Sequence, residues 1–254
     1  GDAAGFALTD ARFALDNLPD YRFEASGSLA GATGEDPALS LIASGELANM
    51  DLLLTWVGVD LSPLGSARAS IALSGRLGAP AVDQMTLVTS SSEGLWLSIN
   101  GSSGPGSLTS VTVPRDSDFR VYLDAPSLGV LQPWLAGELP LDPGPWELTG
   151  RLRERDGQLA LEEIRGRLGT PERLQLTVDG KIGQVDLTRP AAADALAELD
   201  LRIGASSPDL QRALAPLGLP YLIPNQLQLQ ASVTAKGEGS ALRLQDGTAQ
   251  EGRG

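Results

Sequence analysis

The sequence has 254 residues, of which 42% are hydrophobic and 20% charged, and its formal net charge is −13. This hydrophobic content is ample for a core and excludes a disordered chain. The acidic balance argues against nucleic acid and anionic lipid headgroups as partners, because both require clustered Lys or Arg. The lack of His and Cys excludes imidazole bases, thiolate nucleophiles, disulfides and His-ligated metals.

The length suits one large all-β domain or two smaller ones. No apolar run approaches the roughly 18 residues that a membrane-spanning helix needs. The first residues also lack the basic and then apolar profile of a signal peptide. We therefore expect the chain as given to be soluble.

Alternating apolar residues predict short strands at 6–8, 13–15 and 21–25, with a turn-rich connection over 27–37. A fourth strand is predicted over 39–47. Asn49 is placed to cap a helix that ends before Ser62 and Pro63. Further strands are predicted at 67–77, 82–90 and 95–100, and the Gly- and Ser-rich residues 101–106 form the most flexible break.

The stretch 119–183 has the clearest pattern. A strand at 119–125 leads to a short helix that Ser127 is placed to cap, and a Pro-rich loop follows at 139–145. Strands are then predicted at 146–152, 159–168 and 174–182. Asp156 and Gly157 are typical of a hairpin turn, and a change of phase near Glu162 and Glu163 predicts a β-bulge.

The last part of the chain repeats this arrangement. A strand at 199–205 precedes a helix for which Ser207 is the predicted cap, with Pro208 at the first helical position. Residues 218–224 form another Pro-rich loop. A long alternating strand is then predicted at 227–235, followed by a Gly-containing turn and a short strand at 242–244.

The spacing of these elements indicates a repeat. The three predicted caps lie 78 and 80 residues apart, and the string Leu73-Ser-Gly-Arg-Leu77 resembles Leu148-Thr-Gly-Arg-Leu152. We therefore predict one continuous repetitive unit over 1–254, with an N-terminal meander at 6–38 and repeats at 39–101, 119–183 and 199–247. The fold class is mainly β: a repetitive antiparallel sheet, groove-shaped or sandwich-like, with about three short α-helices.

These motifs resemble the AsmA-like proteins of Gram-negative bacteria. The likeness rests on a strand, a Pro-Ser-Leu or Ser-Pro-Asp-Leu helix start, the loop Leu-Pro-Leu-Asp-Pro-Gly-Pro and the strand Trp-Glu-Leu-Thr-Gly-Arg-Leu. It covers 119–247, and more weakly 39–101. The resemblance implies a periplasmic segment of a longer protein held in the inner membrane by an N-terminal helix that this sequence lacks. It also implies a β-groove that carries phospholipid between the two membranes, with no catalytic residue and with possible envelope protein partners.

The inward residues of the predicted strands are the candidate lining of such a groove. An apolar groove can hold acyl chains, whose burial is non-directional, so no cofactor or metal is expected. The same alternation also suits the dry core of a sandwich or barrel, and periodicity does not separate the two. The candidate residues are Val121, Leu123, Trp146, Leu148, Leu152, Leu159, Leu161, Leu174, Leu176, Val178, Leu201, Ile203, Leu227, Leu229 and Val233.

Other signals favour structural roles. Carboxylates such as Asp116, Asp156 and Glu163 are expected on turns or solvated faces, because no spacing matches a calcium loop. Trp134 and Trp146 flank the Pro-rich loop and are expected to pack a helix against the sheet, with stacking on a sugar or acyl chain as the alternative. The rival function is a non-catalytic structural or adhesive β-repeat that binds protein or glycan. An enzyme is disfavoured.

Overall fold

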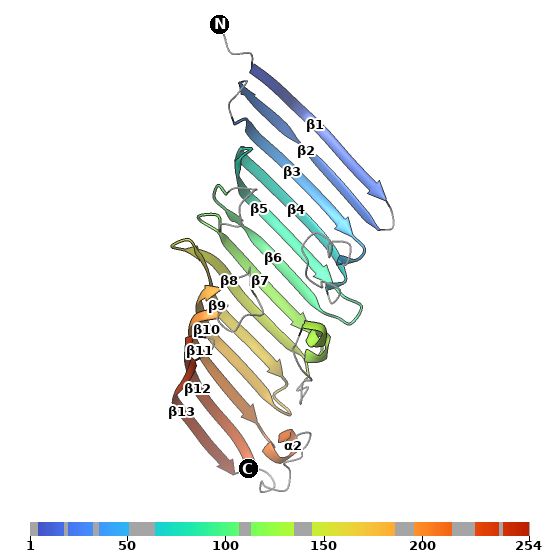
Figure 1. The fold of residues 1–254 in the computed structure, drawn as a ribbon. Coiled ribbons are helices and arrows are strands. Elements are labelled where there is room, and N and C mark those ends of the chain that lie inside the picture. The colour runs from blue at the N-terminus through green and yellow to red at the C-terminus, as the bar shows by residue number, and fades with distance from the viewer. Residues whose placement is uncertain are drawn as a thin grey trace. The chain divides into compact units, whose positions relative to one another are not determined.

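The computed structural model describes residues 5–17, 20–32, 36–50, 64–106, 113–134, 144–185, 196–214, 227–238 and 241–253. The described strands form one open 13-stranded antiparallel sheet, in which strand order follows the sequence (Figure 1). This confirms the mainly-β prediction. The strands are β1 (Gly5–Asn17), β2 (Tyr21–Ala32), β3 (Ala38–Leu47), β4 (Ser66–Arg76), β5 (Ala79–Ser90), β6 (Trp96–Ser103), β7 (Asp118–Ala125), β8 (Trp146–Arg155), β9 (Gln158–Gly169), β10 (Gln175–Val185), β11 (Leu196–Ser207), β12 (Leu227–Glu238) and β13 (Ala241–Arg253).

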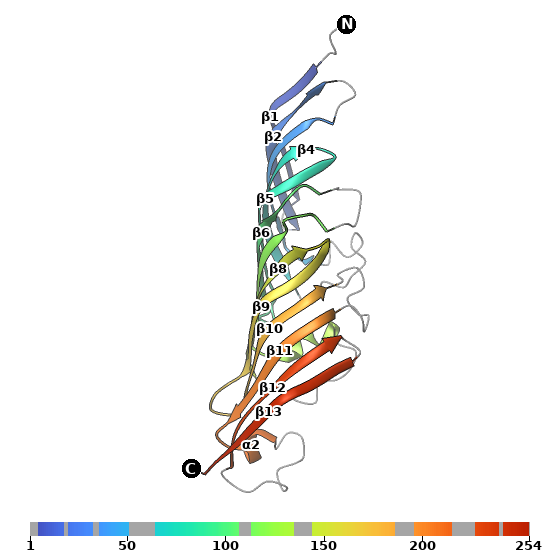
Figure 2. The ribbon, with the colours of Figure 1, turned by 90° about the vertical axis from the view of Figure 1, so that its left-hand side faces the viewer.

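The chain divides into two compact units, which we call unit 1 and unit 2. Unit 1 comprises 1–92, 96–121 and 152–158, and unit 2 comprises 93–95, 122–151 and 159–254. Figure 2 shows the strands of each unit from another side, as a single layer. Because all the described strands belong to one sheet, they do not form the sandwich that the sequence left open.

Period-two alternation explains why these segments pair as strands with two distinct faces. Between β10 and β11, Leu176 lies opposite Ala205 and Val178 lies opposite Ile203, so like residues share a face. The hairpin turn between β8 and β9 is the predicted one. Asp156 has a φ of 52° and Gly157 a φ of 82°, the left-handed pair that a two-residue turn needs.

The N-terminal strands are longer than predicted. The segments 6–8 and 13–15 are one strand, β1, which continues through a bulge where Asp10 takes a φ of 52°. Residues 27–32, predicted as a connection, belong to β2, since Gly27 pairs with Leu41 and Ser28 with Ser40. Residues 101–103 likewise belong to β6. Pairing with a neighbouring strand satisfies the backbone polar groups there, and this outweighs the turn preference of Gly and Ser.

The prediction of three short α-helices is not supported. Leu128–Trp134 is a 3-10 helix, η3, and its Gly129 and Pro133 both disfavour a regular α-helix. The third segment, Leu210–Leu214, is a single five-residue helical turn, α2. The helix predicted after Asn49 falls at 51–63, outside the described residues.

Two of the predicted caps make capping contacts. The Ser127 Oγ accepts the Gly129 N–H at 2.9 Å at the start of η3. The Ser207 Oγ accepts the Asp209 N–H at 3.3 Å. The first turn of α2 is capped more directly by Asp209, whose Oδ1 accepts the Arg212 N–H at 3.0 Å.

Several strands contain β-bulges. Register shifts lie in β1, β5, β9 and β13, and a further shift lies in β10 between Ile182 and Val185. The shift in β9 lies at Glu162 and Glu163, as predicted, and Glu163 has a φ of 53°. Asp246, at the shift in β13, has a φ of 52°. The shifts in β1, β5, β9 and β13 lie four strands apart, which agrees with the period near 80 in the sequence.

Candidate functional site

The candidate site in unit 2 is the apolar face of the sheet. Val178, Ile203 and Val233 lie in one row across β10, β11 and β12, each opposite the next in the strand register. Leu176, Ala205 and Ala231 form the row beside it. Ile203 is 36% exposed and the other members of both rows are half-buried. Residues in the interior of a packed core are buried, so these two rows are covered incompletely, whereas Ile164, Ile182 and Ala235 on the same face are buried.

The structure places the fifteen predicted site residues as follows. Val121 and Leu152 belong to unit 1 and the others to unit 2. Leu174 is buried and precedes β10 rather than lying within it, and Leu227 begins β12 opposite Arg253. The half-buried members are Val121, Leu123, Trp146, Leu148, Leu152, Leu159, Leu161, Leu176, Val178, Leu201, Leu229 and Val233.

Glycines on the apolar face let side chains from neighbouring strands spread over the backbone. A Cβ at Gly150 would lie 2.9 Å from Leu161 Cδ1, because the Leu161 side chain occupies that space. In unit 1, a Cβ at Gly45 would meet the Phe23 ring in the same way. Each glycine is therefore covered by a side chain from the neighbouring strand, and that side chain keeps the face apolar at that point.

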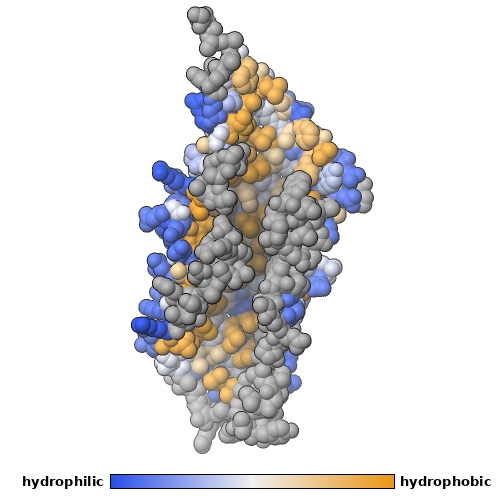
Figure 3. All heavy atoms as spheres, in the orientation of Figure 1, coloured by the Kyte–Doolittle hydropathy of each residue, from blue (hydrophilic) through white to orange (hydrophobic). Residues whose placement is uncertain are grey.

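Unit 1 carries apolar residues on β1 to β5 that the site prediction did not include. Phe13, Ala25, Ala43, Ile71 and Met85 lie in register across β1 to β5. On the edge strand β1, Phe13 is 61% exposed. Figure 3 shows hydrophobic residues gathered on the visible face of each unit, with hydrophilic residues towards its margins.

The opposite face of each unit is polar and carries ion pairs. In unit 1, Arg68 Nε lies 2.8 Å from Glu46 Oε1. In unit 2, Arg167 Nε lies 2.7 Å from Glu147 Oε1. The Arg68 and Arg167 side chains are more than half exposed, so these pairs contribute little to stability. Their charges make this face hydrophilic.

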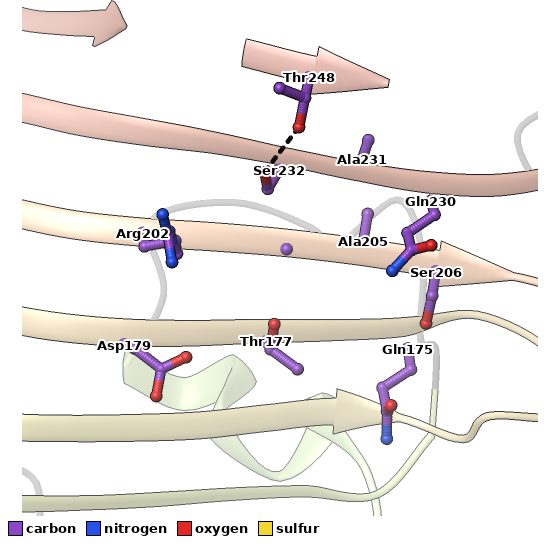
Figure 4. Close-up of a pocket in the computed structure, with 11 residues that line it drawn as sticks. Gln175, Thr177, Asp179, Arg202, Ala205, Ser206, Gln230, Ala231, Ser232 and Thr248 are labelled. Atoms are coloured by element: carbon purple, nitrogen blue, oxygen red, sulfur yellow. Dashed lines mark hydrogen bonds between the residues drawn. The ribbon is translucent and has the colours of Figure 1, made fainter. Parts of the chain in front are cut away.

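A shallow depression of about 370 Å³ lies on the polar face of unit 2 (Figure 4). Polar side chains from β10 to β13 line it, among them Gln175, Thr177, Arg202 and Gln230. Ser232 Oγ and Thr248 Oγ1 lie 3.0 Å apart and share a hydrogen bond, which Figure 4 marks. The surface that these side chains make is hydrophilic.

Two aromatic residues of unit 2 make contacts beside the candidate site. The Trp146 indole N–H donates to the Ser127 carbonyl oxygen at 3.0 Å, which ties the start of β8 to the segment before η3. This is the packing role expected for Trp146, whereas the side chain of Trp134 lies outside the described residues. The pKa of Tyr122 is raised, first by partial burial of the phenol and then by the carboxylates of Asp124 and Glu147.

The described carboxylates occupy the structural positions expected of them. Asp116 and Asp156 lie at turns with left-handed backbone, and Glu163 lies in the β9 bulge. Asp118 Oδ2 lies 3.5 Å from Arg153 Nε. Within the described ranges, no group of three or more acidic residues is placed to hold a metal ion. In the same ranges, no helix combines the length and apolar character needed to cross a membrane.

Sequence reasoning missed several residues of the apolar face. Ile164, Leu199 and Ala205 share this face with the predicted residues but were not among them. The alternation in β9 and β11 was a sufficient signal for all three, once the bulge after Leu161 is allowed for.

Comparison with protein-family models, curated proteins and solved structures gave no significant match.

Proposed function

We propose that this chain is a periplasmic segment of an AsmA-like protein and that its apolar face holds phospholipid acyl chains during transport between membranes. The proposal follows from the motif resemblance and from one observation in unit 2. The row Val178, Ile203 and Val233 is apolar, aligned across three strands and incompletely covered. Apolar surface of this kind is usually covered by a partner or ligand.

The chemistry of the face suits acyl chains. Burial of each methylene contributes roughly 0.8 kcal/mol and has no preferred direction. An acyl chain can therefore slide along a surface of Leu, Val, Ile and Ala side chains. At Gly150 the Leu161 side chain lies over the glycine backbone, so no side chain of residue 150 projects from the face. Such a face discriminates poorly between lipid species, which suits bulk phospholipid transport in outer-membrane lipid homeostasis.

The remaining parts of the proposal concern the whole protein. A membrane anchor outside this sequence would hold the segment at the inner membrane, and envelope proteins would deliver or receive lipid. The polar face, with pairs such as Arg167 and Glu147, would remain in the aqueous periplasm. No chemical step is proposed: the segment would bind and release lipid without acting as an enzyme, cofactor or metal centre.

Native mass spectrometry with solvent extraction, on protein purified without detergent, tests the proposal. Phospholipid should copurify with the chain and be lost in Leu176→Asp and Leu148→Asp variants that keep their strand content by circular dichroism. Thr177→Asp is the matched control, because Thr177 follows Leu176 on β10 and lies on the polar face. A lipid-free, cooperatively folding chain would refute lipid binding and favour the structural or adhesive β-repeat.

A further inference from the structure

Trp96 is an exposed aromatic residue on the polar face of unit 1. It begins β6 and lies opposite Ser90 in the strand register. Ser98, two residues further along β6, lies in one row with Val88 and Arg68, so alternation puts Trp96 on the face of Arg68. Trp96 is 42% exposed. Because Trp residues are on average largely buried, a Trp exposed on a hydrophilic face is a candidate contact for a ligand.

Two depressions meet beside Trp96. The first, of about 350 Å³, is lined by Trp96 itself together with Ser90. The second, of about 440 Å³, adjoins it, because both are lined by Arg68 and Val88. Small-molecule sites have volumes from roughly 300 Å³ upwards, so each depression has room for a small ligand.

Polar side chains cross the strands in two straight rows within these depressions. The first row consists of Arg22, Glu46 and Arg68 on β2, β3 and β4. The second row consists of Ser44, Ser70 and Thr86 on β3, β4 and β5. Neighbouring strands lie about 4.8 Å apart, so each row presents hydrogen-bonding groups at regular intervals along a line.

The charges in these depressions are balanced. Arg68 Nε lies 2.8 Å from Glu46 Oε1, and Arg22 Nη2 lies 2.8 Å from Glu24 Oε1. All four side chains are more than half exposed, so their remaining N–H groups and carboxylate oxygens are open to a ligand. Since each cation already has a carboxylate partner, and the net charge of the chain is −13, the site does not favour an anion.

A neutral sugar chain matches this combination of groups. One face of a pyranose ring presents C–H groups, which pack on the electron-rich face of an indole ring. The hydroxyl groups at the edge of the sugar both donate and accept, so they can pair with guanidinium, carboxylate and hydroxyl groups together. An acyl chain would require an apolar surface, and a nucleic acid would require unpaired cations.

We infer that the polar face of unit 1 carries a binding site for a neutral, extended oligosaccharide of the β-linked glucan type. One sugar ring stacks on Trp96, and the hydroxyl groups of the chain bind Arg68 and Glu46. The straight rows favour an extended chain over a coiled one. The polar depression of unit 2 is not equivalent, because none of the described residues that line it is aromatic. The site goes beyond the lipid proposal, which concerns the apolar face, and does not depend on it.

NMR of the full chain labelled with nitrogen-15 tests the inference with cellohexaose as the probe. The chain has four Trp residues, and the Trp96 indole signal is the one that disappears in Trp96→Phe. Cellohexaose should shift this signal progressively. Maltohexaose, which is coiled, and hexagalacturonate, which is acidic, should bind at least about tenfold more weakly.

Substitutions of Trp96 separate aromatic stacking from simple hydrophobic contact. Trp96→Leu keeps an apolar side chain without an aromatic face, and should weaken cellohexaose binding by about tenfold or more in a titration followed on the ligand signals. Trp96→Tyr keeps a ring and should retain most of the affinity. Gln230→Ala, in the polar depression of unit 2, is the matched control and should leave binding unchanged. Circular dichroism checks that each variant keeps its strands.

An unshifted Trp96 indole signal in the presence of cellohexaose would overturn the inference. Unchanged affinity in Trp96→Leu would also overturn it, because the aromatic face would then contribute nothing. Tighter binding of hexagalacturonate than of cellohexaose would mean that the site binds anions instead. Loss of phospholipid in the Leu176→Asp variant should leave cellohexaose binding intact, so this inference and the lipid proposal can fail separately.

Discussion

The side chains of Leu148 and Val178, from strands on either side of β9, both lie over Gly166. A Cβ at Gly166 would be 2.7 Å from Val178 Cγ1 and 3.2 Å from Leu148 Cδ1. The glycine is itself buried. The apolar face is therefore packed across three strands at this point, and the two side chains cover the glycine backbone.

This contact predicts that Gly166→Ala destabilises the protein by about 1–3 kcal/mol, because the added methyl overpacks the face. Urea unfolding measures the change. In a Val178→Ala background the same substitution should cost less, since the nearest methyl group is gone. Equal costs in the two backgrounds would contradict the packing described.

Gly180→Ala should destabilise more strongly, by about 2 kcal/mol or more, because the residue has a φ of +146° and the Cβ would meet backbone. The nearest atom, Asp200 O, cannot move away as a side chain can. Gly5→Ala is the control, since its Cβ would meet only Gly31 O, at 3.6 Å. Urea midpoints that shift equally for the two variants would refute the close approach of the Asp200 backbone oxygen to Gly180.

Ser207→Ala should cost about 1–2 kcal/mol, because it removes a part-buried hydrogen bond. The Ser207 Oγ donates to the Arg173 carbonyl at 2.5 Å and accepts the Asp209 N–H at 3.3 Å. Ser206→Ala, on the polar face next to it, should change stability by less than about 0.5 kcal/mol. Thermal and urea unfolding of both variants measure the difference, and a neutral Ser207→Ala would mean that the bond contributes nothing.

Thr89→Val should stabilise the protein by about 1 kcal/mol, since it replaces a buried hydroxyl by a methyl group of similar size. Thr89 is 1% exposed on the apolar face of unit 1, and its Oγ1 has no hydrogen-bond partner in the described structure. Thr86→Val on the polar face controls for strand propensity. A fall in the urea midpoint for Thr89→Val would show that the hydroxyl is satisfied in solution.

The sequence by itself determined those features that depend on near neighbours. Alternation assigned residues to the two faces, as in Leu176 and Thr177. The Asp156-Gly157 turn and the bulge at Glu162 and Glu163 were also predictable, because turn chemistry and a change of phase are local properties.

Only the tertiary structure decided which residues meet across strands and how far each strand runs. Gly27 and Ser28 are strand residues because Leu41 and Ser40 pair with them, and Val178 reaches Gly166 through the register of β9 and β10. The sequence pattern likewise did not determine that the sheet is open rather than part of a sandwich. A residue in a closed core and a residue on an incompletely covered face have the same period of two, so alternation does not distinguish them.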